Sequence, residues 1–331
     1  MPNGTAQSFG VLNYTGALFN KGNTATPLTS IIGSRAAATD HVEFAVGQEY
    51  DTGNTAAQPE ISETASLTAP DPTYETRVQR TNVTQIFQRT VAVSYGKMSN
   101  MGTLSGLNVS GQSANPANEL DFQTGVMLQK LKNDVEYTFI NGVYQKATTD
   151  AEANKTRGLV SAITTNVKAM AGQPMSYWAV CQMLEQMGNN NTPINDLVLW
   201  MDSTTRLQLN ADASQNGLTI VDNSREVNGI NISKLTTGLG DIGLYTGRFL
   251  PAGTCLVLNL NAIRPVIQPV PGKGNFFLEP LAKTGASEKY QLFGQIGLDH
   301  GLEWLHGKFT GLATTFTPPA YSRSVYVVNN D

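Results

Sequence analysis

The segment "TRVQRTNVTQIFQRTVAVSYG", residues 76–96, decides how the rest of the chain is interpreted. It has no proline and is rich in Thr, Val, Ile, Phe and Tyr, which favour β-strands. Its second half alternates apolar and polar residues through Val91, Val93 and Tyr95, whereas its first half gives neither face a consistent apolar stripe. An isolated hairpin of this kind is marginal in water. The segment therefore predicts a strand whose packing partners lie outside its own hairpin.

The residues before this segment add little core of their own. Residues 1–40 show no hydrophobic period, so we expect an extended or partly ordered arm. Residues 41–51, "HVEFAVGQEYD", alternate apolar and polar side chains and predict a half-buried strand. Residues 52–75 are small and polar and include prolines. Arm and loop together use about a quarter of the chain, and long segments without a core indicate a functional role.

A long amphipathic helix is predicted after the segment, over residues 115–141. Asn115 is a suitable cap and Pro116 a suitable first residue, and apolar residues then recur at spacings of three and four. At 1.5 Å per residue this helix is roughly 40 Å long. A second helix is predicted over residues 174–188, with Trp178, Cys181, Leu184 and Met187 on its apolar side.

The C-terminal third of the chain is dominated by strand signals. "DLVLWMD" predicts a buried strand, and from about residue 217 onward apolar runs alternate with turn residues. With the two helices, this pattern predicts an α+β fold.

Composition narrows the class of protein. Of 331 residues, 40% are hydrophobic, which allows a sizeable core, and only 15% are charged, against about 25% in average globular proteins. Such a neutral polar surface suits contact with other protein, and a net charge of −4 excludes a globally basic nucleic-acid binder. The two cysteines, Cys181 and Cys255, predict free thiols and no disulfide framework. No apolar run approaches the ~20 residues of a membrane span.

The sequence carries no catalytic signature. Walker A, G-x-S-x-G and H-E-x-x-H patterns are absent. Residues 238–243 match G-x-G-x-x-G, but the following residues predict strand and turn where a dinucleotide site needs a helix. The histidines, His41, His300 and His306, lack the spacing of a zinc site. We therefore expect no catalytic, cofactor-binding or metal-binding residues.

Four segments, in this order along the chain, resemble the major capsid proteins of tailed bacteriophages, which have the HK97-like fold. They are "TPLTSIIG", "NVTQIFQRTVAVS", "KLKNDVEYTFING" and "EPLAKTGASEKYQLFGQIGLDHGLEWLHGKFTGL". The resemblance implies an N-terminal arm (1–40), a P-domain strand with the extended β loop or E-loop (41–98, the loop itself about 50–95), a P-domain segment with the spine helix (99–170, helix 115–141), an A-domain (171–270), and a P-domain return with the C-terminal tail (271–331).

The resemblance also implies a function. The chain would self-assemble into pentamers and hexamers of an icosahedral shell that encloses double-stranded DNA. It would be made in the host cytoplasm and end in the virion capsid, without membrane contact. Scaffolding, portal and decoration proteins are the implied partners, and the acidic net charge predicts only weak, nonspecific contact with DNA. Two alternatives remain open: an encapsulin-like compartment shell, and a secreted β-rich adhesin or tail protein.

Two further expectations concern the loop and the arm. Some relatives crosslink a loop lysine to a neighbour's asparagine, but this loop has no lysine and Lys97 lies only at its base, so we expect no crosslink. No amphipathic helical prefix precedes the arm, which favours a separate scaffold or a processed chain.

The interface is expected in the returning part of the loop, lying over a neighbouring subunit's P-domain. Acidic residues gather in the outer part of the loop and arginines in its return, and such a pattern can fix the register between subunits. The expected interface residues are Arg77, Arg80, Asn82, Gln85, Phe87 and Arg89. The alternatives are that Phe87 belongs to the local core and that the arginines are merely solvated.

Overall fold

The computed structural model describes residues 26–50, 58–69, 74, 77–99, 119–194, 196–215, 220–227 and 230–318. The chain divides into two compact units. One comprises residues 1–26, 33–158 and 262–302, and the other comprises residues 27–32, 159–261 and 303–331. Each unit has its own sheet.

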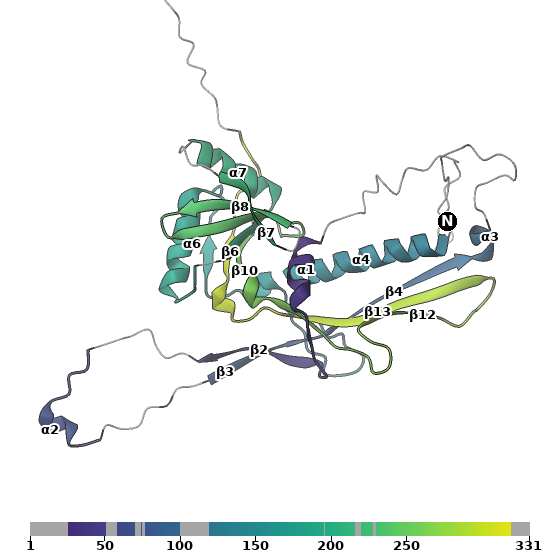
Figure 1. The fold of residues 1–331 in the computed structure, drawn as a ribbon, viewed down its shortest axis with the longest axis horizontal. Helices are drawn as coiled ribbons and strands as arrows, with labels where there is room; N and C mark the ends of the chain where they lie inside the picture. Colours follow the sequence, from purple (N-terminus) through teal and green to yellow (C-terminus); the bar gives the residue numbers. More distant parts are fainter. Residues whose placement is uncertain are drawn as a thin grey trace, which may run out of the picture. The chain divides into compact units, whose positions relative to one another are not determined.

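The first unit is built on a five-stranded sheet. Its strands are β1 (Ala37–Ala38), β4 (Gln85–Ser94), β11 (Arg264–Ile267), β12 (Phe276–Pro280) and β13 (Ser287–Asp299). The long strand β13 pairs antiparallel with β11, β12 and β4, while β1 pairs parallel with β11. Figure 1 shows β4, β12 and β13 running together beside helix α4. The one-turn helix α3 (Tyr95–Met98) follows β4.

Helix α4 (Glu119–Asn141) confirms the predicted long helix over the described part of its range. Asn115 and Pro116, the expected cap and first residue, lie outside the described residues. Its buried apolar side chains recur at spacings of four, as an α-helical face requires: Met127, Leu131, Val135 and Phe139. This face packs toward β4, whose inward side chains Phe87, Val91 and Val93 are also buried.

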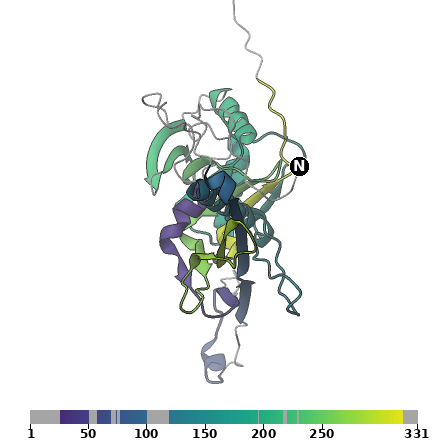
Figure 2. The same cartoon turned by 90° about the vertical axis from the view of Figure 1, so that its right-hand side faces the viewer.

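A separate two-stranded ribbon carries the loop. Strands β2 (Glu43–Tyr50) and β3 (Arg77–Val83) pair antiparallel, with an irregularity between Ala45 and Gln48 (Figure 1; Figure 2). The short helix α2 (Glu63–Ser66) lies in the connection between them.

The expectation that the whole segment 76–96 packs between chains is wrong for its second half. Strand β4 pairs with β13 of the same chain along its whole length, from Gln85↔Ile296 to Ser94↔Ser287. The sequence does not reveal this pairing, because β13 lies some 200 residues further along the chain.

The second unit is built on a seven-stranded sheet. In spatial order its strands are β5 (Val167–Ala169), β14 (Gly307–Thr310), β10 (Cys255–Asn259), β6 (Leu197–Met201), β9 (Gly240–Thr246), β8 (Ile230–Thr237) and β7 (Ile220–Val227). Its helices are α1 (Pro27–Ile32), α5 (Leu159–Ala162), α6 (Tyr177–Asn189) and α7 (Ser203–Gln215). Short 3-10 turns lie at Gly33–Arg35 in the first unit and at Leu260–Ala262 and Glu303–Leu305.

Helix α6 buries only part of the predicted face: Leu184 and Met187 are fully buried as predicted, and the buried side is turned away from Trp178. Val180, Met183 and Met187 are fully buried, whereas the side chain of Trp178 is 68% exposed and Cys181 is half-buried. The sulfur atoms of Met183 and Met187 lie over the backbone of Gly307 in β14. The flexible methionine side chains of α6 therefore pack on this sheet, and such side chains fill irregular core gaps well.

Candidate functional site

The base of the extended loop, where β3 ends and β4 begins, is held by the buried side chain of Asn82. Its Nδ2 atom donates to the carbonyl oxygens of Leu298 (2.7 Å) and Arg157 (3.1 Å). Its Oδ1 atom accepts from the backbone N–H groups of Arg157 (2.8 Å) and Val83 (2.9 Å). All four hydrogen-bonding positions of the amide are used. Asn82 therefore ties the loop base to two distant segments of its own unit.

At the same junction, side chains continue the hydrogen bonding of β13 beyond its last regular pair with β4. The β4–β13 ladder ends at Gln85↔Ile296. Two residues further along β13, side chains bond to the backbone of Leu298. Asn82 donates to the carbonyl of Leu298, and the hydroxyl of Thr156 accepts from the N–H group of Leu298 (3.1 Å). The Oε1 atom of Gln85 accepts from the N–H group of Thr156 (3.2 Å). Backbone groups at the end of β13 are thus satisfied by polar side chains.

Thr84, the residue between the two strands, is also buried and bonded. Its N–H group donates to the carbonyl of Val42 (2.8 Å), and its hydroxyl donates to Oε1 of Gln268 (2.7 Å). The chain changes pairing partner at this residue, from β2 to β13. These contacts fix the direction in which β2 and β3 leave the sheet.

An exposed ion pair lies at the start of the ribbon. The Glu43 carboxylate accepts from the Lys146 ammonium and from the Thr81 hydroxyl (2.7 Å). The hydrogen bond from Lys146 is the main cause that lowers the pKa of Glu43, and the hydrogen bond from Thr81 lowers it further. The hydrogen bond to Glu43 in turn raises the pKa of Lys146. Because the folded-state pKa of Glu43 is lowered, this contact favours the folded state at neutral pH and is lost on acidification through that pKa.

Further along β4, Phe87 and Arg89 also contact their own unit. Phe87 is 6% exposed and belongs to the core. The guanidinium of Arg89 bonds to Oδ2 of Asp134 on α4 through Nε (2.9 Å) and Nη2 (2.5 Å). Both side chains are about two-fifths exposed, so the ion pair contributes at most about 1 kcal/mol.

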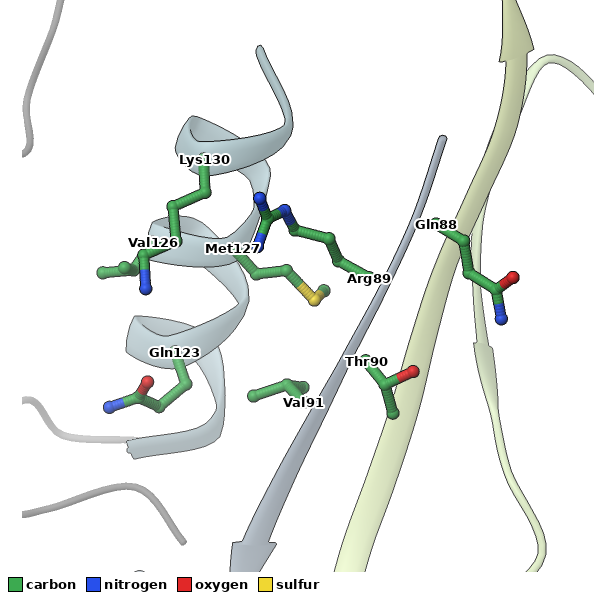
Figure 3. Close-up of a pocket in the computed structure, with 8 residues that line it drawn as sticks. All are labelled: Gln88, Arg89, Thr90, Val91, Gln123, Val126, Met127 and Lys130. Carbon is green, nitrogen blue, oxygen red and sulfur yellow. The ribbon is translucent and has the colours of Figure 1, made fainter. Parts of the chain in front are cut away.

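A groove lies beside Arg89, between β4 and α4 (Figure 3). Its volume is about 310 Å³, and its lining residues are Gln88, Arg89, Thr90, Val91, Gln123, Val126, Met127 and Lys130. In Figure 3 the side chains of Arg89, Val91 and Met127 point into the space between strand and helix, and Lys130 lies along the helix. The lining is mixed, with three apolar residues beside two basic and three neutral polar ones.

The outer part of the loop, residues 58–69, contains a short helix but no buried residue. Ser62 caps α2 by accepting a hydrogen bond from the N–H group of Ala65 (3.1 Å). Every residue from 58 to 69 is exposed, including Ile61 (66%) and Leu67 (84%). Two large apolar side chains are thus presented to solvent on a short structured segment.

The six expected interface residues therefore have different environments. Asn82, Gln85, Phe87 and Arg89 contact their own unit, whereas Arg80 is half-buried and the side chain of Arg77 lies outside the described residues. Sequence reasoning missed the partners of the junction, such as Thr156 and Gln268, because no local pattern marks them.

The described part of the chain offers no candidate metal site. No group of three or more His, Cys, Asp or Glu residues there could hold a metal ion. Residues Gly238 and Leu239 form the turn between β8 and β9, so the G-x-G-x-x-G pattern leads into a strand. No helix within the described ranges is both long and apolar enough to cross a membrane.

Comparison with known sequences decides the family. The sequence model for the SU10 major capsid protein matches residues 1–313, nearly the whole chain. The chain belongs to the SU10 major capsid protein family. Among curated proteins, no sequence matches it.

Solved structures confirm the HK97-like fold. The Cyanophage A-1(L) capsid subunit is 10% identical with a TM-score of 0.61, and the match covers 93% of this chain and 97% of that one. The holo-SrpI encapsulin of Synechococcus elongatus PCC 7942 is 10% identical with a TM-score of 0.60, covering 96% of both chains. A chain of Mycobacterium phage Patience is 9% identical with a TM-score of 0.58, covering 92% and 86%. At these identities the likeness establishes the fold alone.

Membership of the family establishes the general function. The protein is a structural component of the virion capsid and not an enzyme. It assembles with copies of itself into the icosahedral shell of a phage.

Proposed function

We propose that this capsid protein forms pentamers and hexamers, which close into a shell around the double-stranded DNA genome of the phage. The observation that carries the proposal is the exposure of Ile61 and Leu67 on the structured outer loop. In the assembled shell, a neighbouring copy covers these side chains. Burying them there stabilises the shell by the hydrophobic effect, at about 25 cal/mol for each Å² of apolar surface removed from water.

The two units take different roles in this proposal. The unit containing β4, β13 and α4 serves as the P-domain and carries the E-loop between β2 and β3. The seven-stranded unit, centred on residues 159–261, serves as the A-domain and makes contacts around the symmetry axes. Residues 1–40 are assigned to the N-terminal arm, although the expectation that they lack a core does not hold for α1, where Leu28, Ile31 and Ile32 are buried.

Within the loop, the interface is proposed at its outer part and at Arg77 and Arg80. Asn82, Gln85 and Phe87 support the interface indirectly, because their bonds and burial hold the loop base in a fixed direction. Scaffolding, portal and decoration proteins are the further partners in this proposal. Contact with DNA is weak and nonspecific, in keeping with the net charge of −4.

The encapsulin alternative shares the fold, since the TM-scores for the encapsulin and the cyanophage subunit are 0.60 and 0.61. The family match to a phage major capsid protein favours DNA as the cargo. Nuclease treatment of purified particles tests this choice. Protected genome-length DNA supports the proposal, and protein-filled particles without DNA contradict it.

Substitution of the two exposed loop side chains tests the role of the loop. The double variant Ile61→Ser, Leu67→Ser should fold as a subunit but give few closed shells in electron micrographs. Val143→Ser is the matched control, because Val143 is also an exposed apolar residue (70%) but lies outside the loop. If the double variant assembles as well as the control, the loop does not carry the interface.

A further inference from the structure

We propose that His306 is a pH-sensitive lock of the seven-stranded unit, and that its protonation releases the strand ends it holds, so that the capsid subunit loses stability in acid. The lock concerns each subunit by itself and does not depend on the proposed role of the loop. A buried hydrogen bond, the polar network around it and the charges of the surrounding elements carry the proposal.

The ring of His306 is fully buried and accepts a hydrogen bond. His306 lies between the 3-10 turn Glu303–Leu305 and strand β14. Its Nδ1 atom accepts from the backbone N–H group of Asn259, the last residue of β10 (3.2 Å). A ring nitrogen that accepts a hydrogen bond carries no proton, so this bond assigns the single proton of the neutral ring to Nε2. A second proton can enter only at Nδ1, where it breaks the bond and leaves a charge in a site closed to water.

The backbone that leads into His306 is held by polar side chains from two other segments. The buried amide of Asn166, just before β5, donates to the carbonyl oxygens of Trp304 (2.7 Å) and His306 (3.1 Å). The Oδ1 atom of Asn166 accepts from Nδ2 of Asn190, the C-cap residue of α6 (2.7 Å). The hydroxyl of Thr192 donates to the carbonyl of Trp304 (2.7 Å). Because β14 lies between β5 and β10 in the sheet, a displacement of His306 acts on the ends of three strands.

Glu303 is the acidic residue of the same turn. It is 2% exposed, and its carboxylate accepts from the N–H groups of Thr164 (2.8 Å) and Thr165 (3.1 Å) and from the hydroxyl of Thr165. A negative charge nearby favours a proton on His306, but these three hydrogen bonds already stabilise the carboxylate. Glu303 therefore needs no imidazolium partner to remain charged. The acid of the neighbouring helix α6, Glu185, is exposed.

Basic residues lie on the elements around His306 as well. Lys308 follows two residues later on β14, and its ammonium donates to the carbonyl of Val160 in α5 (2.8 Å). Burial lowers the pKa of Lys308, and attraction to Glu303 opposes that shift. On β5, Lys168 donates to a glutamine of α6 (2.7 Å), while β10 and α5 carry no charged residue. The positive charge of Lys308 therefore counteracts the effect of Glu303 on His306.

The direction of the pH effect follows from where the proton can bind. In the unfolded chain the ring takes up a proton below the ordinary histidine pKa of about 6.5. In the folded subunit the bond from Asn259 excludes that proton. The unfolded state then binds more protons, so stability falls as the pH falls. One such histidine raises the equilibrium constant for unfolding about 30-fold between about pH 7.5 and about pH 5.

His306→Asn tests the lock, because asparagine places an oxygen near the position of Nδ1 but does not titrate. Urea unfolding of unassembled full-length subunits at both pH values gives the equilibrium constants. We expect their rise in acid to be about 30-fold smaller in the variant than in the wild type. An equal rise in the two proteins overturns the proposal.

The other two histidines serve as controls. His41→Asn should keep the wild-type pH dependence, because the side chain of His41 is 81% exposed. His300 is also buried, but it is present in the wild type and in both variants, so its own contribution cancels.

NMR of the wild-type subunit decides the question even where His306→Asn does not fold. His306 is the only histidine that follows a leucine, so labelling leucine at its carbonyl carbon and histidine uniformly identifies its signals. Its Nδ1 atom should remain unprotonated in the folded subunit over the whole range in which free histidine titrates. Protonation of Nδ1 in the folded subunit with the midpoint of free histidine overturns the proposal.

Discussion

Replacement of Asn82 by alanine should destabilise the subunit itself, and not only its assembly. Asn82 makes four hydrogen bonds in a fully buried site, to Leu298, Arg157 and Val83. Alanine removes all four and leaves the backbone groups of these residues without that partner. An interface residue behaves differently, because its loss affects only contacts between subunits.

The size of the effect follows from these bonds. Each contributes about 1 kcal/mol net, and a buried group left unsatisfied costs about 1–3 kcal/mol unless water enters. We therefore expect the free energy of unfolding to fall by about 3–5 kcal/mol. With urea slopes of about 1–3 kcal/mol/M, the unfolding midpoint should fall by on the order of 1–2 M or more.

Urea unfolding of unassembled subunits, followed by circular dichroism, measures this change. Gln85→Ala removes one hydrogen bond at the same junction and should cost only about 1 kcal/mol. Gln88→Ala, on the exposed side of β4, should change stability by less than about 0.5 kcal/mol. If Asn82→Ala unfolds at the wild-type midpoint yet yields no shells, Asn82 acts at an interface and the reasoning is refuted.

Three other measurements test the remaining structure. Gly142→Ala should destabilise the subunit by about 1–3 kcal/mol, because the added Cβ would lie 2.4 Å from a backbone oxygen. Gly125→Ala lies in open space on α4 and should stabilise the subunit by up to about 1 kcal/mol. Equal effects of the two substitutions on the melting temperature would contradict this packing. A thiol reagent should label half-buried Cys181 in the native subunit but not Cys255, whose pKa burial raises; prompt labelling of both would show that the β10 core opens. Because the loop contains no lysine and Lys97 only follows it, shells should give a single subunit band on a denaturing gel, and a ladder of multimers would reveal crosslinks.

Local patterns in the sequence predicted the elements that can be recognised without knowing which other elements they pack against. The spacing of Met127, Leu131 and Val135 predicts α4 wherever it packs, and an apolar run predicts β6. Pattern alone predicted the buried face of α6 only in part, since Leu184 and Met187 are buried as expected and Trp178 is not. Trp178 is apolar but exposed, because α6 turns the side of Met183 and Met187 toward its own sheet.

The candidate site was harder to predict, because its bonds join distant parts of the chain. Asn82 bonds to residues 75 and 216 positions away, and no local periodicity encodes such a contact. The sequence therefore predicted Asn82 only as an interface residue of the loop. Its full burial explains why a residue disfavoured in strands stands at the end of β3.

The base and the outer segment of the loop place different demands on the sequence. At the base, Asn82, Thr84 and Gln85 use their side chains to complete backbone hydrogen bonding, so the ribbon leaves the sheet in one direction. A fixed direction lowers the conformational entropy that ordering the loop on a neighbour would otherwise cost. In the proposed assembly, the outer segment can then remain without a core and still be covered by a neighbouring copy. Substitutions at the base should therefore impair folding and assembly together, whereas substitutions at Ile61 or Leu67 should impair assembly alone.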